Sequence, residues 1–162
     1  MKELIEIAGR VADRLIARKQ TVAVAESSAG GLISAALLAV PGASRYFLGS
    51  AVVYTREARR TVMDIPDGDM KGIRSSSEPY ARLLADQIRR RLASDWGVSE
   101  TGAAGPAGNR YGDAAGHSCI GIAGPGQSVL TIETASADRV ANMHAFARAA
   151  LMELDRQLAQ SS

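Results

Sequence analysis

Short runs of apolar or β-branched residues alternate with long amphipathic stretches along this chain, and this alternation restricts the possible folds more than any other feature. Apolar side chains that recur every three or four residues are typical of helices that bury one face. Helices are predicted at residues 4–16, 32–40, 56–63, 77–94 and 137–160. Short buried strands are predicted at residues 21–25, 49–55, 119–123 and 128–134.

The order of these elements predicts an α/β fold. Strands that alternate with helices form sheets whose two faces are covered. The turn Gly124-Pro125-Gly126-Gln127 lies between the last two predicted strands, which is a hairpin signal and adds antiparallel pairing. We therefore expect a three-layer α/β/α arrangement with a mixed sheet covered by helices on both faces.

Local signals place several helix ends. Pro41 and Gly42 end the helix predicted at 32–40. Ser77 suits the N-cap of the helix at 77–94, and residues 64–76 before it are predicted to be a surface connection. The residues predicted to face inward on the two longest helices are Tyr80, Leu83, Leu84, Ile88, Leu92, Val140, Met143, Ala147, Leu151, Leu154 and Leu158.

The length and composition favour a soluble protein with one domain over residues 1–162. Hydrophobic residues make up 46% and charged residues 22%, as in ordinary globular proteins. Cys119 is the only cysteine, so an intramolecular disulfide is excluded and a cytoplasmic location is expected. We find neither a signal-peptide pattern nor an apolar stretch of ~20 residues, so a membrane is not an expected partner.

The charge balance argues against nucleic acid as a partner. The chain has 19 basic and 17 acidic residues, and aromatic residues make up 4%. Its overall field is weak and it has few side chains on which bases could stack. Arg89-Arg90-Arg91 is expected on a solvated helix face, with contact to nucleic acid as the minority alternative.

The turn at residues 25–31 is the first candidate site. Here Glu26, Ser27, Ser28 and two glycines join a predicted strand to a predicted helix. Free backbone N–H groups at such a turn can bind an anion or an oxyanion, and a serine there can act as a nucleophile. The alternative is that one serine only caps the helix.

Two further segments carry polar or glycine-rich patterns. Residues 101–108 are predicted to be a glycine-rich turn, which by itself is a weak signal. Tyr54 is followed by Arg56, Arg59 and Arg60, which could clamp a phosphate. A metal site is not expected, because the two histidines, at 117 and 144, show no ligand-pair spacing.

Five short motifs resemble the C-terminal domain of the CinA family. They are A-E-S-S-A-G-G-L (25–32), V-P-G-A-S-R-Y-F (40–47), V-V-Y-T-R-E-A-R (52–59), S-E-P (77–79) and T-G-A-A-G-P (101–106). The resemblance implies an α/β/α domain that hydrolyses the carboxamide of nicotinamide mononucleotide to nicotinate mononucleotide and ammonia. It also implies a cytoplasmic protein, a homo-oligomer that is most simply a dimer, and no metal or organic cofactor.

This chain departs from the family pattern at residues that matter for catalysis. Ser27 matches the family serine of A-E-S-C-T-G-G, but Ser28 and Ala29 stand where the family has cysteine and threonine. Arg59 stands where the family has lysine, and Asp113 to Gly116 where it has lysine-proline-valine-glycine. An arginine cannot take a proton from a serine hydroxyl as a lysine can.

The resemblance and the residues together give two hypotheses. The first is an amidohydrolase whose activity is weakened or lost, with Ser27 as nucleophile, Tyr54 and Arg59 in the catalytic site and the N–H groups of residues 29–31 as oxyanion hole. The second is a non-catalytic binding protein for a nucleotide or another phosphate metabolite. The residues expected to bind the ligand in either case are Glu26, Ser28, Ala29, Gly30, Gly31, Thr101, Gly102 and Gly105.

Overall fold

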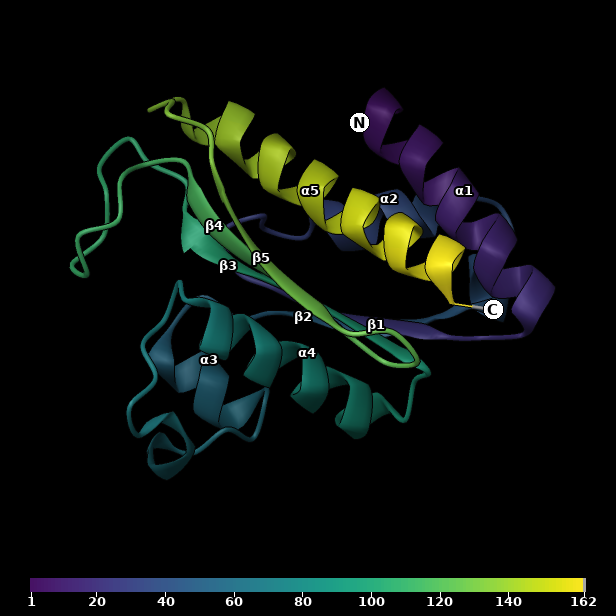
Figure 1. Cartoon of the computed structure of the whole chain (residues 1–162), viewed down its shortest axis with the longest axis horizontal. Helices are drawn as coiled ribbons and strands as arrows, with labels where there is room; N and C mark the ends of the chain where they lie inside the picture. Colours follow the sequence, from purple (N-terminus) through teal and green to yellow (C-terminus); the bar gives the residue numbers. More distant parts are fainter. Residues whose placement is uncertain (162) are drawn as a thin grey trace.

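A five-stranded mixed sheet forms the middle layer of the protein (Figure 1). The structure is a computed structural model and describes residues 1–161. The strands are β1 (Val22–Glu26), β2 (Phe47–Val52), β3 (Trp96–Ala103), β4 (His117–Ala123) and β5 (Ser128–Glu133), in the order β2-β1-β3-β4-β5. The first three run parallel, whereas β4 pairs antiparallel with β3 and β5.

Helices cover both faces of this sheet. On one face lie α1 (Lys2–Arg18), α2 (Leu32–Ala39) and α5 (Arg139–Gln160), and on the other lie α3 (Arg56–Thr61) and α4 (Glu78–Leu92) (Figure 1). Two short 3₁₀ helices, Ala43–Arg45 and Asp67–Met70, lie in the connections. The predicted three-layer α/β/α fold with a mixed sheet is therefore confirmed.

Each face of the sheet has its own hydrophobic core. The larger core packs α1, α2 and α5 on the sheet and contains Trp96 and Phe146, both fully buried. The smaller core packs α4 and the α3 region against small side chains of β1, and contains Tyr80 and Leu84. Two opposed cores fix the sheet between its helices, so the strand ends that carry polar residues have a rigid support.

Two glycines let α4 lie directly against the sheet. A Cβ at Gly97 of β3 would lie 2.2 Å from the carbonyl oxygen of Ala85 in α4. A Cβ at Gly121 of β4 would lie 2.5 Å from the carbonyl oxygen of Ala81. Since no real side chain tolerates these distances, glycine at both positions sets the height of α4 above the sheet.

Most predicted element boundaries lie within about three residues of the observed ones, but no range was predicted for β3, the central strand of the sheet. Ser77 caps α4 by accepting a hydrogen bond from the N–H of Tyr80, as predicted. The turn predicted at 101–108 is wrong at its start, because Thr101, Gly102 and Ala103 continue β3 through pairing with β4. Leu92 and Val140 were predicted to face inward but are exposed, since they lie at helix ends beyond the cores. No helix within residues 1–161 is long and apolar enough to cross a membrane.

Candidate functional site

A cleft of about 760 Å³ opens at the carboxyl ends of β1 and β3. Ser27, directly after β1, and Thr101, near the end of β3, lie on its wall. The connections that follow β1 and β2 run on opposite faces of the sheet, so strand order reverses beside β1. Ligands of open α/β sheets bind in the crevice at such a point.

The cleft brings together five of the residues predicted for the site. Its lining includes Ser27, Tyr54, Arg59, Thr101 and Gly102, which come from four different segments of the chain. The other predicted site residues do not line it; they are Glu26, Ser28, Ala29, Gly30, Gly31 and Gly105. The turn at 26–31 therefore contributes one residue, Ser27, to the lining of the cleft and otherwise supports it.

Glu26 shapes this turn from inside the protein. Its carboxylate is fully buried and accepts hydrogen bonds from the N–H groups of Gly31, Ile33 and Ser34 at 2.9–3.1 Å. The Ser34 hydroxyl donates to it as well, at 2.5 Å. A side-chain carboxylate thus fills the anion site that the N-terminus of α2 offers.

Glu100 of β3 holds the same turn from the other side. It is fully buried and accepts hydrogen bonds from the N–H groups of Ser27 and Ala29, at 3.0 and 2.8 Å. The hydroxyls of Ser28 and Ser118 donate to its second oxygen, at 2.6 and 3.0 Å. Burial raises the pKa of Glu100, although these four hydrogen bonds act to lower it.

These contacts overturn the expected oxyanion hole. The N–H of Ala29 donates to Glu100, that of Gly30 to the carbonyl of Ser27, and that of Gly31 to Glu26. The three donors are therefore engaged within the protein and do not face the cleft. Ser28 is likewise a structural residue, because its buried hydroxyl is bonded to Glu100.

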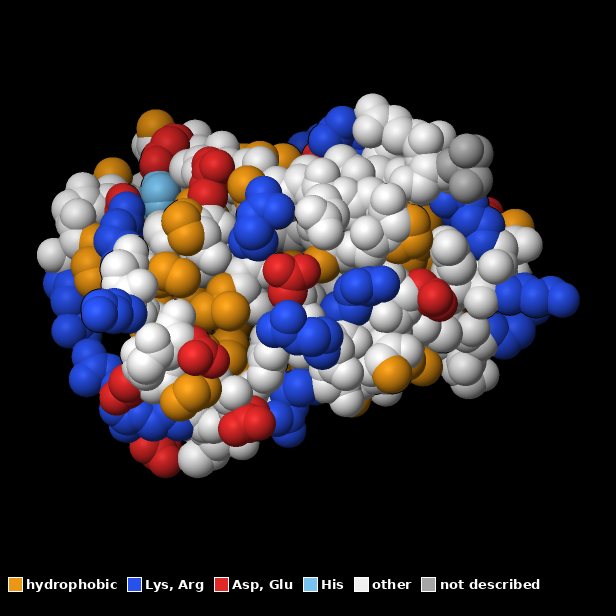
Figure 2. All heavy atoms as spheres, turned by 60° about the horizontal axis from the view of Figure 1, so that its bottom comes forward, with side chains coloured by type: hydrophobic (Ala, Val, Ile, Leu, Met, Phe, Trp, Pro, Cys, Tyr) orange, Lys and Arg blue, Asp and Glu red, His pale blue; other side chains and the backbone are white. Residues whose placement is uncertain are grey.

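Arginines dominate the charge of the cleft. Arg56, Arg59, Arg74 and Arg110 line it together with one acidic residue, Asp67. Figure 2 views the molecule from the α3 and α4 side and shows several Lys and Arg side chains at its left-hand end, where α3 lies. The lining, all within residues 1–161, contains neither lysine nor histidine. The cleft is therefore suited to an anionic ligand.

Arg59 is the buried member of this group. Only 7% of its surface is exposed, and its guanidinium pairs with Asp67, which also binds Arg60. Its Nε atom is buried and has no hydrogen-bond partner among residues 1–161. Because the carboxylate of Asp67 lies against it, the charge at position 59 is partly compensated within the protein.

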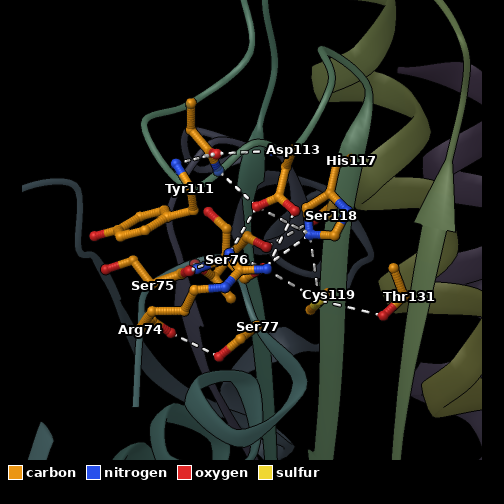
Figure 3. A network of polar contacts seen from close by, with 12 residues as sticks. Arg74, Ser75, Ser76, Ser77, Tyr111, Asp113, His117, Ser118, Cys119 and Thr131 are labelled. Atoms are coloured by element: carbon orange, nitrogen blue, oxygen red, sulfur yellow. Dashed lines mark hydrogen bonds and ion pairs between the residues drawn. The ribbon is translucent and has the colours of Figure 1, made fainter. Parts of the chain in front are cut away.

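Arg74 links the cleft to a buried polar network (Figure 3). It makes a two-pronged ion pair with Asp113, at 2.7 and 3.1 Å, and this pair lowers the pKa of Asp113. The N–H of Ser76 donates to the hydroxyl of Thr101 at 3.1 Å, which ties this wall of the cleft to β3. Two of the segments that line the cleft are thereby held in fixed positions.

His117, at the start of β4, lies behind this wall. Its Nδ1 is 2.5 Å from a carboxylate oxygen of Glu133, and its Nε2 is 2.8 Å from the carbonyl oxygen of Ser76. Both partners accept hydrogen bonds, so the geometry fits an imidazolium that donates from both nitrogens. Burial acts to lower the pKa of His117, but the bonds to Glu133 and Ser76 and the nearby Asp113 outweigh it, and the pKa is raised.

Tyr54 is positioned by a contact that the sequence does not reveal. Arg139, at the start of α5, donates to the Tyr54 hydroxyl at 3.2 Å and also to the carbonyl oxygen of Gly105. Gly105 therefore supports the site through its backbone although it lies outside the cleft. Within residues 1–161, no group of His, Cys, Asp and Glu side chains is arranged to hold a metal ion.

Several residues of the site were missed in the sequence. Glu100 lies between Ser99 and Thr101 in a segment without a recognisable motif, and Arg74 and Arg110 lie in connections that also lack one. The one available signal for Glu100 was a carboxylate inside a buried strand, because such a group needs several donors around it.

Comparisons with known proteins agree with this architecture. The family model of the CinA C-terminal domain matches residues 4–158. A CinA-like protein of Gloeobacter violaceus is 40% identical over 122 residues, which are 75% of this chain and 29% of that protein. A CinA-like protein of Salinibacter ruber is 38% identical over 146 residues, 90% of this chain and 35% of the relative. The chain thus spans about a third of the length of these relatives.

Solved structures match the whole fold. A CinA superfamily protein from Klebsiella pneumoniae has a TM-score of 0.89 at 27% identity, over 96% of this chain and 98% of that one. The competence/damage inducible protein CihA from Agrobacterium tumefaciens has a TM-score of 0.87 at 26% identity, over 98% and 96% of the two chains. The family model matches residues 4–158, which are nearly the whole of this chain, so the chain belongs to the CinA family and corresponds to its C-terminal domain.

Proposed function

We propose that the cleft binds nicotinamide mononucleotide and that Ser27 hydrolyses its carboxamide slowly. The observation that carries the proposal is the combination of Ser27 with four arginines in one cleft at the carboxyl ends of β1 and β3. The arginines suit the phosphate of a nucleotide, and the serine supplies the nucleophile. Such a reaction would belong to nicotinamide nucleotide salvage in the cytoplasm.

The proposed reaction follows the usual course of acyl transfer. The Ser27 oxygen attacks the carboxamide carbon, the C–N bond breaks, and the nitrogen leaves as ammonia with the proton of the serine hydroxyl. Water then hydrolyses the ester, which releases the carboxylate and restores the hydroxyl. Arg59 can stabilise the negative oxygen of the tetrahedral intermediate, but it cannot carry the proton, so water must.

The missing base sets the expected rate. General acid–base help contributes about 100- to 10,000-fold in such reactions. With arginine at position 59 we therefore expect turnover that is faint by comparison with a site that holds a neutral lysine there. The pairing of Arg59 with Asp67 supports a second candidate, a protein that binds the nucleotide without turning it over.

The test is ammonia release from nicotinamide mononucleotide by the wild type, by Ser27→Ala and by Ser50→Ala. Ser50 is an exposed serine on β2 that does not line the cleft, so it is the matched control. Release that disappears only in Ser27→Ala supports the amidohydrolase. Release that persists in Ser27→Ala contradicts the nucleophile, and saturable binding without release supports the second candidate.

A further inference from the structure

We infer that the cleft accepts a nucleotide with two linked phosphate groups, and that Arg110 binds the second phosphate. The inference rests on the proposed function, because it concerns the ligand of the same cleft. It extends that function from a mononucleotide to a diphosphate-bearing nucleotide.

The charge of the cleft exceeds that of one phosphate ligand. Four arginines and one aspartate line it, a net charge of +3, and the pairing of Arg74 with Asp113 leaves +2. A phosphate monoester carries about −1.5 to −2 at neutral pH. The pyridinium ring of nicotinamide mononucleotide offsets part of that charge, so such a ligand leaves the cleft under-neutralised. A diphosphate adds the missing negative charge.

The two lining arginines that form no ion pair with a carboxylate within residues 1–161 lie on separate segments. Arg56 is on α3, and Arg110 is on the long connection between β3 and β4; neither forms an ion pair within residues 1–161. Figure 1 shows these segments on opposite sides of the same end of the sheet. Two linked phosphates offer two sets of anionic oxygens, one for each of these exposed cations.

The segment that carries Arg110 is held in place before any ligand binds. The Asn109 side chain donates to the Asp113 carboxylate at 2.8 Å and accepts from the N–H groups of Tyr111 and Asp113 at 3.0 and 3.1 Å. Asp113 is in turn clamped by Arg74, which lies on another wall of the cleft. Arg110 is thus presented from a fixed support, which reduces the entropy lost on binding.

The aromatic ring beside Arg110 completes this outer part of the cleft. The guanidinium carbons of Arg74 and Arg110 lie 5.2 and 5.8 Å from the centre of the Tyr111 ring. Cation–π contacts at these distances orient both guanidinium groups. Tyr111 is itself exposed and lines the cleft, so the two cations and the ring form one surface for a phosphate and the group attached to it.

The experiment compares dissociation constants of AMP and ADP for the wild type, Arg110→Gln and Arg45→Gln by calorimetry at constant ionic strength. Arg45 is the charge-matched control, because it lies before β2, at the other end of the strands from the cleft. One additional charge-assisted hydrogen-bonding contact is worth about tenfold in affinity. We expect ADP to bind about tenfold more tightly than AMP, and Arg110→Gln to remove that difference while Arg45→Gln keeps it.

A further comparison, of NAD with ADP, identifies the class of compound that carries the diphosphate. NAD that binds more tightly than ADP supports a diphosphate-bridged dinucleotide, and the reverse order supports a nucleoside diphosphate. Equal affinities of AMP and ADP, or an ADP affinity unchanged in Arg110→Gln, overturn the inference. If the protein releases ammonia from nicotinamide mononucleotide but binds AMP and ADP equally well, the proposed second phosphate site fails and the proposed amidohydrolase stands. If ADP binds more tightly than AMP but no ammonia is released, the second phosphate site stands and the proposed amidohydrolase fails.

Discussion

At the scale of single residues, the two buried glutamates differ in the donors that face them. One oxygen of Glu26 accepts from two N–H groups, and the other accepts from the N–H and hydroxyl of Ser34. In Glu100, one oxygen accepts from two N–H groups and the other from the hydroxyls of Ser28 and Ser118. Hydroxyls can turn and become acceptors, whereas an N–H cannot.

This difference predicts unequal costs of the same substitution. Glu26→Gln places an amide NH₂ against a backbone N–H in either orientation, so we expect a loss of about 1–3 kcal/mol in the free energy of unfolding. In Glu100→Gln the NH₂ can donate to both hydroxyls, and the expected loss is below about 1 kcal/mol. Urea unfolding of the two variants checks the order, and equal losses would contradict it.

If the proposed function holds, Arg59 is the residue whose replacement we expect to raise turnover. In Arg59→Lys alone, Asp67 would lie beside the amine and keep it protonated. We therefore expect little gain from that single change and a larger gain from Arg59→Lys with Asp67→Asn, toward the ~100-fold effect of a general base. Ammonia release from nicotinamide mononucleotide measures both, with Asp67→Asn alone as the control that should gain nothing.

His117 gives a pH dependence of stability. Its folded-state pKa is raised above the ordinary value of 6.5, so its stabilising contribution is complete below that value and is lost as pH rises through the folded-state pKa. We expect the urea midpoint to fall as the pH rises above about 6.5, and to fall less in His117→Gln. Parallel curves for the two proteins would show that His117 is not responsible.

At the scale of elements, the distance between α4 and the sheet depends on Gly97 and Gly121. Gly121→Ala forces a Cβ to 2.5 Å from a backbone oxygen of α4, and we expect it to cost at least about 1–3 kcal/mol. Gly9→Ala in α1 meets no atom within 4 Å and should stabilise by about 0.5–1 kcal/mol. Thermal unfolding of the two variants measures this, with a lower midpoint expected for Gly121→Ala and a higher one for Gly9→Ala than for the wild type.

The elements themselves could largely be predicted from sequence. The cap at Ser77 and the end of α2 before Pro41 are local signals, and both agree with the structure. The continuation of β3 through Gly102 was missed because it depends on pairing with β4, which lies later in the chain. The pattern of a strand does not reveal its partner.

The site could be predicted only in part, for the same reason. Ser27, Tyr54 and Arg59 lie in motifs, so their place in the cleft was expected. Arg74 reaches it because Asp113, 39 residues later, holds it there. From the sequence, the backbone N–H groups of residues 29–31 were expected to be free to bind a ligand. The structure shows that the N–H groups of Ala29 and Gly31 donate to the buried carboxylates of Glu100 and Glu26.

At the scale of the whole molecule, the free edge of the sheet leads us to propose a dimer. β2 is an outer strand whose Leu48 and Val52 are 45% and 48% exposed. Unprotected edges of this kind tend to pair with another chain. We expect light scattering at micromolar concentration to give the mass of two chains, and Leu48→Lys to shift it toward one. A wild-type particle with the mass of a single chain would contradict this.

The contact between α1 and α5 has a consequence for how the protein is made. Arg10 and Arg14 of α1 both bind Asp155 of α5, and Arg10 is 145 residues away from it in the chain. At about 5–20 residues per second, a ribosome needs roughly 7 to 30 seconds to complete the intervening chain. Until then the apolar stripe of the first helix lacks its partner in the last one. We therefore expect the nascent chain to expose this apolar stripe during translation, where a chaperone that binds hydrophobic surface could cover it.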